Sequence, residues 1–575
     1  MAWGPVAAAG DWPLHGYDHA NTRFSPLTQI YRGNVADLDL VWELRTGRQG
    51  SFQATPIVVD GVMYLSTPYN DVLALDAATG RQLWRYSHDL RRQEFCCGPA
   101  NRGVTVAGGR VYMATIDARL LALDAATGAK VFDVEIANPA SGAREVMTPL
   151  LGEAVFRNAE VTGGTGYGAN MAPQVFDGKV FVGITGTGYG LHLDLKDKSG
   201  DAALSVVGLS GGDHGLRGFL AAYDAATGAE LWRWYTVPGV DWTGEWRTET
   251  PDGAPLDRDL AAERASAAQW HESWRLGGGS VWTTPAVDPD RRLLFIGTGN
   301  PAPQMDDLTR PGDNLHTCSV VALNLDTGKL VWSFQQVPHD RWGYDAASPP
   351  VLLTVRHEDR DLPAVAQAGK TGWVYVLDRQ TGKLIRKSEP FVPQRNLFSR
   401  PTAAGVEIAP AILGGSSWSP VAFSAAERLL FVEGIHHPAR YFSKRLEPKP
   451  GSPWQSYTYM ELLEDEQWGT LTAIDTDTGG IRWQVKTAQP LVGGVLATAG
   501  GLLFAGEGGG DFGAWDTTDG RRLWAWHAEA GVNAPAISYA VGRRQYIAVA
   551  AGGNPLFNFK TGDQLLVFAL PAAAE

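Results

Sequence analysis

The stretch ALDAATGRQLW, Ala74–Trp84, is the clearest copy of a motif that recurs along this chain of 575 residues. Six further copies begin at Ala122, Ala222, Ala322, Val376, Ala473 and Ala514. Successive copies start 48, 100, 100, 54, 97 and 41 residues apart. A unit of about 45 to 50 residues explains these spacings if the long gaps hold degenerate copies or insertions, and this length is typical of a four-stranded propeller blade.

Most copies read as a β-hairpin, because an alternating strand runs into a Thr-Gly turn and a second strand ends on an aromatic residue. The copy at Val376 ends instead on Arg386, and the copy at Ala514 has Asp519-Gly520 in its turn. We expect Trp84 to pack between neighbouring blades, and Asp76 and Thr79 to hydrogen-bond the backbone of the turn. Strands near Val41–Trp42 and Leu565–Leu570 would pair the two ends of the chain and close a ring. The sequence therefore predicts an all-β fold, an eight-bladed β-propeller with tryptophan-docking repeats, as one domain over residues 1–575 with an insertion at about 190–209.

Composition and charge exclude several classes of function. A net charge of -13 and a pI near 5.4 argue against nucleic acid or an anionic membrane surface as partner. No apolar run reaches about 18 residues, so we expect no membrane span. Met1–Gly10 lacks the charged start and apolar core of a signal peptide, which we interpret as a leader already removed. Three cysteines, two of them adjacent, exclude a disulfide-rich scaffold, a thiolate zinc site and a CxxCH haem attachment.

The adjacent Cys96 and Cys97, in the run FCCGPANRG, are the most specific chemical signal in the chain. A disulfide between neighbours closes almost no loop and is geometrically strained, so it contributes little to stability. Two free buried thiols are the alternative interpretation. A vicinal disulfide would instead present a flat, sulfur-rich surface to a ligand ring.

Four more segments carry candidate functional residues: GGGSVW at 277–282, IGTGNPAP at 296–303, HDRWGYD at 339–345 and QAGKTGWVYVLDR at 367–379. Taken alone, Trp282 would be a packing residue of a blade and Asn300 a turn residue before Pro301. Gly508, Gly510 and Gly513 satisfy GxGxxG, but the sequence continues as another hairpin, which argues against dinucleotide binding.

With these motifs the chain resembles the family of methanol and ethanol dehydrogenases that depend on pyrroloquinoline quinone (PQQ), over essentially its full length. The resemblance implies that a Cys96–Cys97 disulfide covers one face of the quinone and Trp282 the other. It implies that Arg102 lies near the quinone carboxylates, where the forked donors of a guanidinium suit a planar anion. The other cofactor contacts that it implies are Ser210, Gly211, Lys370, Ser417 and Gly494.

The resemblance also implies a metal ion, Ca²⁺ or a lanthanide, bound by Asn300. Asp213 stands where relatives carry a metal-binding Glu; it keeps the charge and the oxygen ligand that a hard cation prefers, although its side chain is one methylene shorter. Asp345 stands where lanthanide-using relatives carry an additional carboxylate. We therefore expect Asp213, Asn300 and Asp345 to be the metal ligands.

The segment HDRWGYD departs from the family pattern, which usually reads His-Asp-x-Trp-Asp-Tyr. Gly343 occupies the position of the expected catalytic Asp. Two hypotheses follow: Asp345 acts as the base from a shifted backbone, or Asp345 is a metal ligand and the base lies elsewhere. The resemblance implies that Lys370 contacts the quinone oxygens and stabilises them electrostatically. Asp345 and Lys370 are therefore the catalytic candidates.

The function that the resemblance implies is a periplasmic, PQQ-dependent alcohol dehydrogenase that forms an aldehyde or ketone. Without a haem motif the chain would pass electrons to a soluble cytochrome c or similar acceptor, as a monomer or homodimer. Gly343 and Asp213 favour a wider pocket that accepts a bulky secondary alcohol. The alternatives are a noncatalytic propeller scaffold or assembly protein and a PQQ-dependent sugar dehydrogenase; the vicinal cysteines favour the alcohol branch.

Overall fold

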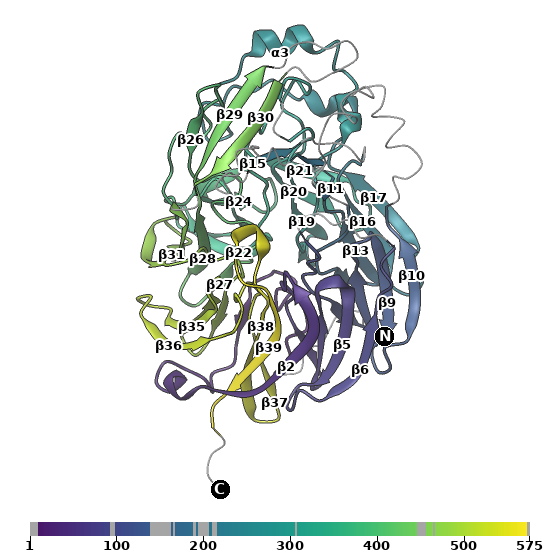
Figure 1. Ribbon diagram of the computed structural model, residues 1–575, viewed down its shortest axis with the longest axis vertical. Coiled ribbons are helices and arrows are strands. Elements are labelled where there is room, and N and C mark those ends of the chain that lie inside the picture. Colours follow the sequence, from purple (N-terminus) through teal and green to yellow (C-terminus); the bar gives the residue numbers. More distant parts are fainter. Residues whose placement is uncertain are drawn as a thin grey trace, which may run out of the picture.

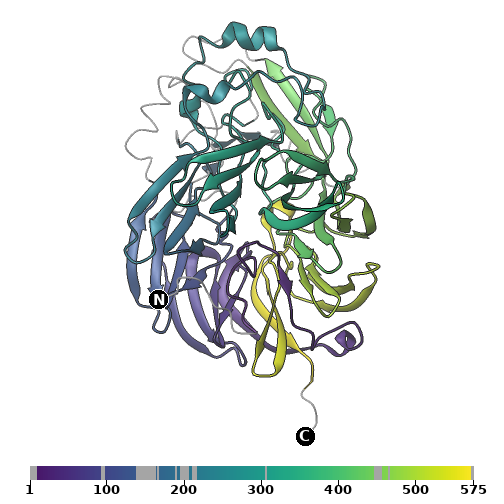
Figure 2. The same cartoon turned by 180° about the vertical axis from the view of Figure 1, so that it is seen from behind.

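The computed structural model is strand-rich, and its sheets are arranged around a common centre (Figures 1 and 2). It describes residues 10–91, 98–137, 163–164, 167–187, 191–193, 206–209, 216–304, 307–445, 456–463 and 466–571. In these ranges the one α-helix is α3 (Leu260–Ser266). The predicted all-β class is therefore confirmed. None of the helices in these ranges is long and apolar enough to cross a membrane.

In the part of the chain that the structure describes, eight sheets share one plan, in which four antiparallel strands follow one another from the centre of the molecule outward. In chain order the first four are β3 (Ile57–Val59), β4 (Val62–Ser66), β5 (Asp71–Asp76), β6 (Gln82–Ser87); β7 (Thr105–Ala107), β8 (Arg110–Ala114), β9 (Arg119–Asp124), β10 (Lys130–Glu135); β12 (Gln174–Phe176), β13 (Lys179–Gly183), β16 (Phe219–Asp224), β17 (Glu230–Tyr235); and β18 (Ala286–Asp288), β19 (Leu293–Gly297), β20 (Ser319–Asn324), β21 (Leu330–Gln335).

The other four sheets include the one that joins the two ends of the chain. They are β22 (Val351–His357), β23 (Arg360–Ala368), β24 (Val374–Asp378), β25 (Leu384–Lys387); β27 (Ala422–Ser424), β28 (Leu429–His436), β31 (Trp468–Asp475), β32 (Ile481–Thr487); β33 (Leu496–Thr498), β34 (Leu502–Gly506), β35 (Asp511–Asp516), β36 (Arg522–His527), to which β1 (Phe24–Ser25) adds a strand; and β37 (Ile537–Val541), β38 (Arg544–Ala551), β39 (Gly562–Ala569), β2 (Asp39–Gly50). Strand β2 pairs with β39, and Trp42 lies opposite Val567.

The recurring motif forms the turn between the third and fourth strands of a sheet. Asp76 Oδ1 accepts hydrogen bonds from the backbone N–H groups of Ala78 and Thr79 and from the Thr79 hydroxyl. The Trp84 ring packs on Gly128 in the turn of the next sheet, and its Nε1 donates to Ala125 O at 3.0 Å. A Cβ at Gly128 would lie 2.6 Å from the ring, so this turn requires glycine. The predicted roles of Asp76, Thr79 and Trp84 are confirmed.

The same aromatic-on-glycine contact links one sheet to the next. The pairs are Trp42 with Gly80, Trp84 with Gly128, Phe132 with Gly228, Trp232 with Gly328, Trp332 with Gly382 and Trp483 with Gly520. Trp524 Nε1 donates to Leu38 O, next to β2. The motif thus fixes how neighbouring sheets pack.

The segment Gly10–Ser25 crosses the centre of the molecule. Its backbone hydrogen-bonds the first strands of six sheets, through Trp12 with Val58, Gly10 with Ala540, His19 with Val287, Ala20 with Leu352, Thr22 with Phe423 and Arg23 with Ala497. The fully buried Arg23 guanidinium donates to the carbonyls of His15, Val495 and Ala536. The segment Gly10–Ser25 therefore links six of the sheets by hydrogen bonds to their first strands.

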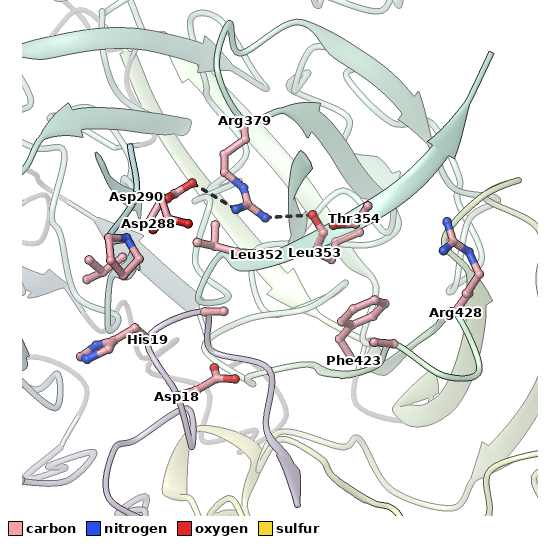
Figure 3. Close-up of a pocket in the computed structure, with 14 residues that line it drawn as sticks. Asp18, His19, Asp288, Asp290, Leu352, Leu353, Thr354, Arg379, Phe423 and Arg428 are labelled. Carbon is pink, nitrogen blue, oxygen red and sulfur yellow. Dashed lines mark hydrogen bonds and ion pairs between the residues drawn. The ribbon is translucent and has the colours of Figure 1, made fainter. Parts of the chain in front are cut away.

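A cavity of about 530 Å³ lies between this segment and three of the sheets (Figure 3). Its Arg379 donates to Asp288 at 3.1 Å and to Leu353 O at 2.9 Å, and its Arg428 pairs with Asp477. The cations of this cavity are thus already neutralised. Asp288 ends β18, which places the cavity at the opposite end of the strands from Trp282, just before β18.

A ninth sheet stands apart from this plan and lies near α3 (Figure 1). It is built from β11 (Gly163–Gly164), β14 (Leu191–Leu193), β15 (Val206–Leu209), β26 (Val406–Ile408), β29 (Ala439–Arg445) and β30 (Ser456–Leu462). The described parts of the predicted insertion, β14 and β15, belong to this sheet. The segment Gly508–Gly513 lies on the β34–β35 hairpin, so the rejection of a dinucleotide motif is confirmed.

Candidate active site

The described candidate residues gather at one end of the strands. Because neighbouring strands are antiparallel, a residue before the first strand and a residue after the second strand of a sheet lie at the same end. Trp282 precedes β18, Asn300 follows β19, Asp345 precedes β22, Lys370 lies between β23 and β24, and Ser417 precedes β27. Backbone bonds join these segments: Gly299 N donates to Ser280 O at 2.8 Å and Ser416 N donates to Gly369 O at 3.1 Å.

Asp345 and Lys370 form a buried pair in this cluster. Lys370 Nζ lies 3.5 Å from Asp345 Oδ1 and donates to Gly343 O at 3.1 Å; both side chains are almost fully buried. Asp345 Oδ1 accepts no hydrogen bond within the described part of the chain. Burial raises the pKa of Asp345 and Asp340 adds to this, whereas the Lys370 charge opposes it. The pair thus presents a buried carboxylate that is ion-paired with Lys370 at Oδ1 but accepts no hydrogen bond there from the described residues.

Asp340 is the second buried carboxylate of the cluster, and its oxygens are already engaged. They accept hydrogen bonds from the backbone N–H groups of Trp342, Gly343 and Tyr344 at 3.1–3.2 Å. Asp340 Oδ2 also accepts one from Asn300 Nδ2 at 2.8 Å. Asp340 therefore has four hydrogen-bond donors, whereas Asp345 Oδ1 accepts no hydrogen bond from the described residues.

Gly343 could not carry the carboxylate that the family pattern places there. Its φ is +92°, and a Cβ at this position would lie 2.4 Å from Ile412 Cγ1. An added side chain would therefore clash with Ile412. The backbone at Gly343 therefore excludes a carboxylate at this position under both hypotheses, whether Asp345 is the base or a metal ligand.

Aromatic rings form the wall beside the buried pair. Trp282 and Trp418 have ring centroids 6.4 Å apart, and Trp418 also contacts Phe557. The Arg102 guanidinium lies 5.0 Å from the Trp282 centroid and 5.5 Å from that of Trp418, and it donates to Trp282 O. A buried cation beside two indole rings suits a planar ligand with negative charge.

Gly494 lies at the edge of the same cluster, where it touches Pro420 and donates its N–H to Glu433 Oε2 at 2.6 Å. Glu433, on β28, is fully buried, and its Oε1 accepts no hydrogen bond from any described residue. Burial raises the pKa of Glu433 to about 8; its bond to Gly494 and the Arg23 charge oppose this. Glu433 is therefore protonated at neutral pH.

The raised pKa of Glu433 predicts a pH-dependent stability. Between about pH 4.5 and 8 the folded chain holds a proton that the unfolded chain releases, so this group lowers the free energy of unfolding as the pH rises. The free energy of unfolding of Glu433→Gln should not fall in this way. We expect the difference between the variant and the wild type to increase, in favour of the variant, by about 3 kcal/mol across this pH range. Urea unfolding at pH 5, 6.5 and 8 measures it; a difference that does not change with pH would contradict the assignment.

Several predicted residues fall outside the described ranges: Cys96, Cys97, Ser210, Gly211 and Asp213. Ser417 is buried in the cluster beside Lys370. Within the described residues no three His, Cys, Asp or Glu side chains gather into a metal site. Sequence reasoning missed Trp418, Asp340 and Glu433. Asp340 stood in the quoted segment HDRWGYD, and Trp418 directly follows the predicted contact Ser417. A lone carboxylate in the apolar strand LLFVEGIH was the available signal for Glu433.

Comparison with known proteins places the chain in a family. Residues 12–135, 205–397 and 385–547 match the model of the PQQ glucose/ethanol/alcohol dehydrogenase β-propeller domain. The quinohemoprotein alcohol dehydrogenase ADH IIB of Pseudomonas putida is 32% identical over 605 aligned positions, which cover 99% of this chain and 79% of that protein. The quinohemoprotein alcohol dehydrogenase of Comamonas testosteroni is 31% identical, over 96% of this chain and 74% of that protein.

Two solved structures support the same placement. The quinohemoprotein alcohol dehydrogenase ADHIIG from Pseudomonas putida HK5 superposes with a TM-score of 0.78 at 30% identity, covering 99% of this chain and 81% of that one. A europium-containing methanol dehydrogenase superposes with a TM-score of 0.77 at 27% identity, covering 98% of both chains. This chain therefore belongs to the PQQ-dependent quinoprotein alcohol dehydrogenases, which are oxidoreductases that act on CH–OH groups.

Proposed function

We propose that this chain oxidises an alcohol to an aldehyde or ketone, with Asp345 as the base that takes the hydroxyl proton. The observation that carries this proposal is the buried Asp345–Lys370 pair, whose carboxylate oxygen Oδ1 accepts no hydrogen bond from the described residues. The pair lies in the cluster that also holds Asn300, Trp282 and Arg102. When bound, PQQ supplies a two-electron acceptor and the cation polarises it.

The residues present fit both groups. Arg102 and Lys370 are buried cations that suit the carboxylates and ring oxygens of PQQ, and Trp282 offers an aromatic face. Cys96 and Cys97 would form the opposite wall, with Ser210, Gly211, Ser417 and Gly494 at the edges. Asn300 and Asp213 would supply oxygen ligands to Ca²⁺ or a lanthanide. A ligand role for Asp345 is the alternative that the experiments below separate from the base role.

Each described residue has a distinct part in the reaction. Asp345 accepts the proton, because its pKa is raised and its Oδ1 has no hydrogen-bond donor. Lys370 holds Asp345 in place and keeps positive charge beside it. The Trp282 and Trp418 rings exclude water from this end of the strands. Gly343 adds no width to the pocket, because Ile412 fills the space that its Cβ would occupy. In this proposal Asp213, one methylene shorter than the Glu of relatives, is the change that favours a bulky secondary alcohol.

The eight sheets would be the blades of one eight-bladed propeller domain over residues 1–575, closed by β2 against β39, with the insertion at 190–209 near the site. The chain would act in the periplasm, where a Cys96–Cys97 disulfide persists. It would pass electrons to a soluble cytochrome c, as a monomer or homodimer.

Reconstitution tests the function. The chain is incubated with PQQ and either Ca²⁺ or a light lanthanide, and dye reduction is measured with methanol, a long primary alcohol, a bulky secondary alcohol and a sugar. We expect alcohol-dependent reduction that is fastest with the bulky secondary alcohol. Methanol preference would contradict the substrate proposal, sugar preference would favour a sugar dehydrogenase, and no PQQ binding with either metal would favour a noncatalytic scaffold.

A further inference from the structure

We propose that Asp340 is a positioning residue, which fixes the orientation of the Asn300 amide so that its oxygen, and not its nitrogen, is presented to the cation. This inference rests on the proposed function, in which Asn300 is a cation ligand. Asp340 touches neither substrate nor cofactor in this proposal; it acts through Asn300. An amide oxygen binds a hard cation and an amide NH₂ group does not, so the orientation decides whether the site forms.

Hydrogen bonds on both sides of Asn300 define its orientation. Asn300 Nδ2 donates to Asp340 Oδ2 at 2.8 Å, and the same oxygen accepts a second hydrogen bond from the Gly343 N–H, so it is an acceptor and the NH₂ group faces it. On the other side Gln304 Nε2 donates to Asn300 Oδ1 at 2.8 Å. Asn300, Gln304 and Asp340 are all buried, so water does not compete for these bonds. A carbonyl oxygen that accepts one hydrogen bond keeps a second lone pair for a cation.

Asp340 is itself held independently of Asn300. The backbone N–H groups of Trp342, Gly343 and Tyr344 all point at its carboxylate. The same turn carries Gly343 O, which accepts a hydrogen bond from Lys370 Nζ, and leads into Asp345. One carboxylate thus links the orientation of a cation ligand to the position of the Asp345–Lys370 pair.

The substitution Asp340→Asn reverses the polarity of this contact. The new amide can still accept from the backbone turn with its oxygen, but its NH₂ group then faces the NH₂ group of Asn300. Asn300 must rotate, which turns its nitrogen toward the cation. We expect the affinity for terbium(III), measured by tryptophan-sensitised luminescence without PQQ or alcohol, to fall by about 10- to 100-fold.

The double variant N300D/D340N restores the contact with donor and acceptor exchanged. The amide at position 340 donates to the carboxylate at position 300, which still offers an oxygen to the cation, and the net charge equals that of the wild type. We expect its terbium affinity to return close to the wild-type value. Asp288→Asn, a buried carboxylate at the opposite end of the strands, is the matched control and should leave terbium affinity unchanged.

The outcomes separate this inference from the proposed function. Wild-type affinity in D340N, or an affinity in N300D/D340N as weak as in D340N, would overturn the positioning role while the cation site stands. Absence of terbium binding in the wild type would overturn the cation site and the positioning role together. Thermal unfolding of each variant confirms that the proteins compared are folded.

Discussion

Replacing Asp345 with Asn is expected to lower kcat/KM for the alcohol by about 10³-fold, because it removes the proton acceptor from the active site. The substitution keeps the shape of the side chain, so Lys370 still contacts an oxygen at position 345. The affinity for PQQ should stay within a few-fold of the wild type, because Arg102 and Trp282 are untouched. Dye-reduction kinetics and PQQ titration by tryptophan fluorescence measure the two quantities.

Two further variants sharpen this result. Gly343→Asp added to D345N should not restore turnover, because a side chain at position 343 meets Ile412. Asp288→Asn should keep kcat/KM within about two-fold of the wild type, since this site is at the far end of the strands. Turnover that persists in D345N, with an altered preference between Ca²⁺ and a lanthanide, would show that Asp345 is a metal ligand and that the base lies elsewhere.

Replacing Arg23 with Met is expected to lower the free energy of unfolding by about 3–5 kcal/mol. The guanidinium is fully buried, and it donates to three carbonyl groups that belong to separate parts of the chain. Methionine fills most of the volume but leaves the carbonyls of His15, Val495 and Ala536 without this donor. Urea unfolding measures the change.

A surface arginine provides the comparison for Arg23→Met. Arg32 pairs with Asp516 at 3.1 Å and has 40% of its side chain exposed. Arg32→Met should therefore lower the free energy of unfolding by less than about 1 kcal/mol. An equal decrease in the free energy of unfolding for the two variants would contradict the role of Gly10–Ser25 in linking the sheets. A large loss confined to R23M would support it.

Much of the fold could be predicted because the repeated turn is a local structure. The pattern Asp-x-x-Thr-Gly encodes hydrogen bonds between residues two and three positions apart, such as those of Asp76 with Ala78 and Thr79. The aromatic residue that ends six of the seven copies packs on a glycine of the turn in a neighbouring sheet or on its backbone, as with Trp84 and Gly128. Local geometry repeated at a regular period is what a sequence expresses most directly.

The candidate site was predictable only in part, because its energetics depend on contacts between distant residues. Lys370 and Asp345 were named from motifs, but the engagement of Asp340 by four donors depends on how the turn after it folds. The raised pKa of Glu433 comes from burial between sheets, which its own strand does not reveal. The path of Gly10–Ser25 through the centre follows from six separate pairings and has no pattern of its own.

Single-turnover reduction of bound PQQ tests the central claim most directly. The chain, loaded with PQQ and a cation, is mixed with alcohol in the absence of oxygen and dye, and the quinone absorbance is followed in the wild type and in D345N. We predict that the wild-type absorbance changes in proportion to the PQQ bound, more slowly when the α-carbon of the alcohol carries deuterium, and that D345N retains PQQ but reacts far more slowly. Bound PQQ that alcohol leaves unchanged in the wild type, or equal rates in the two proteins, would contradict the account.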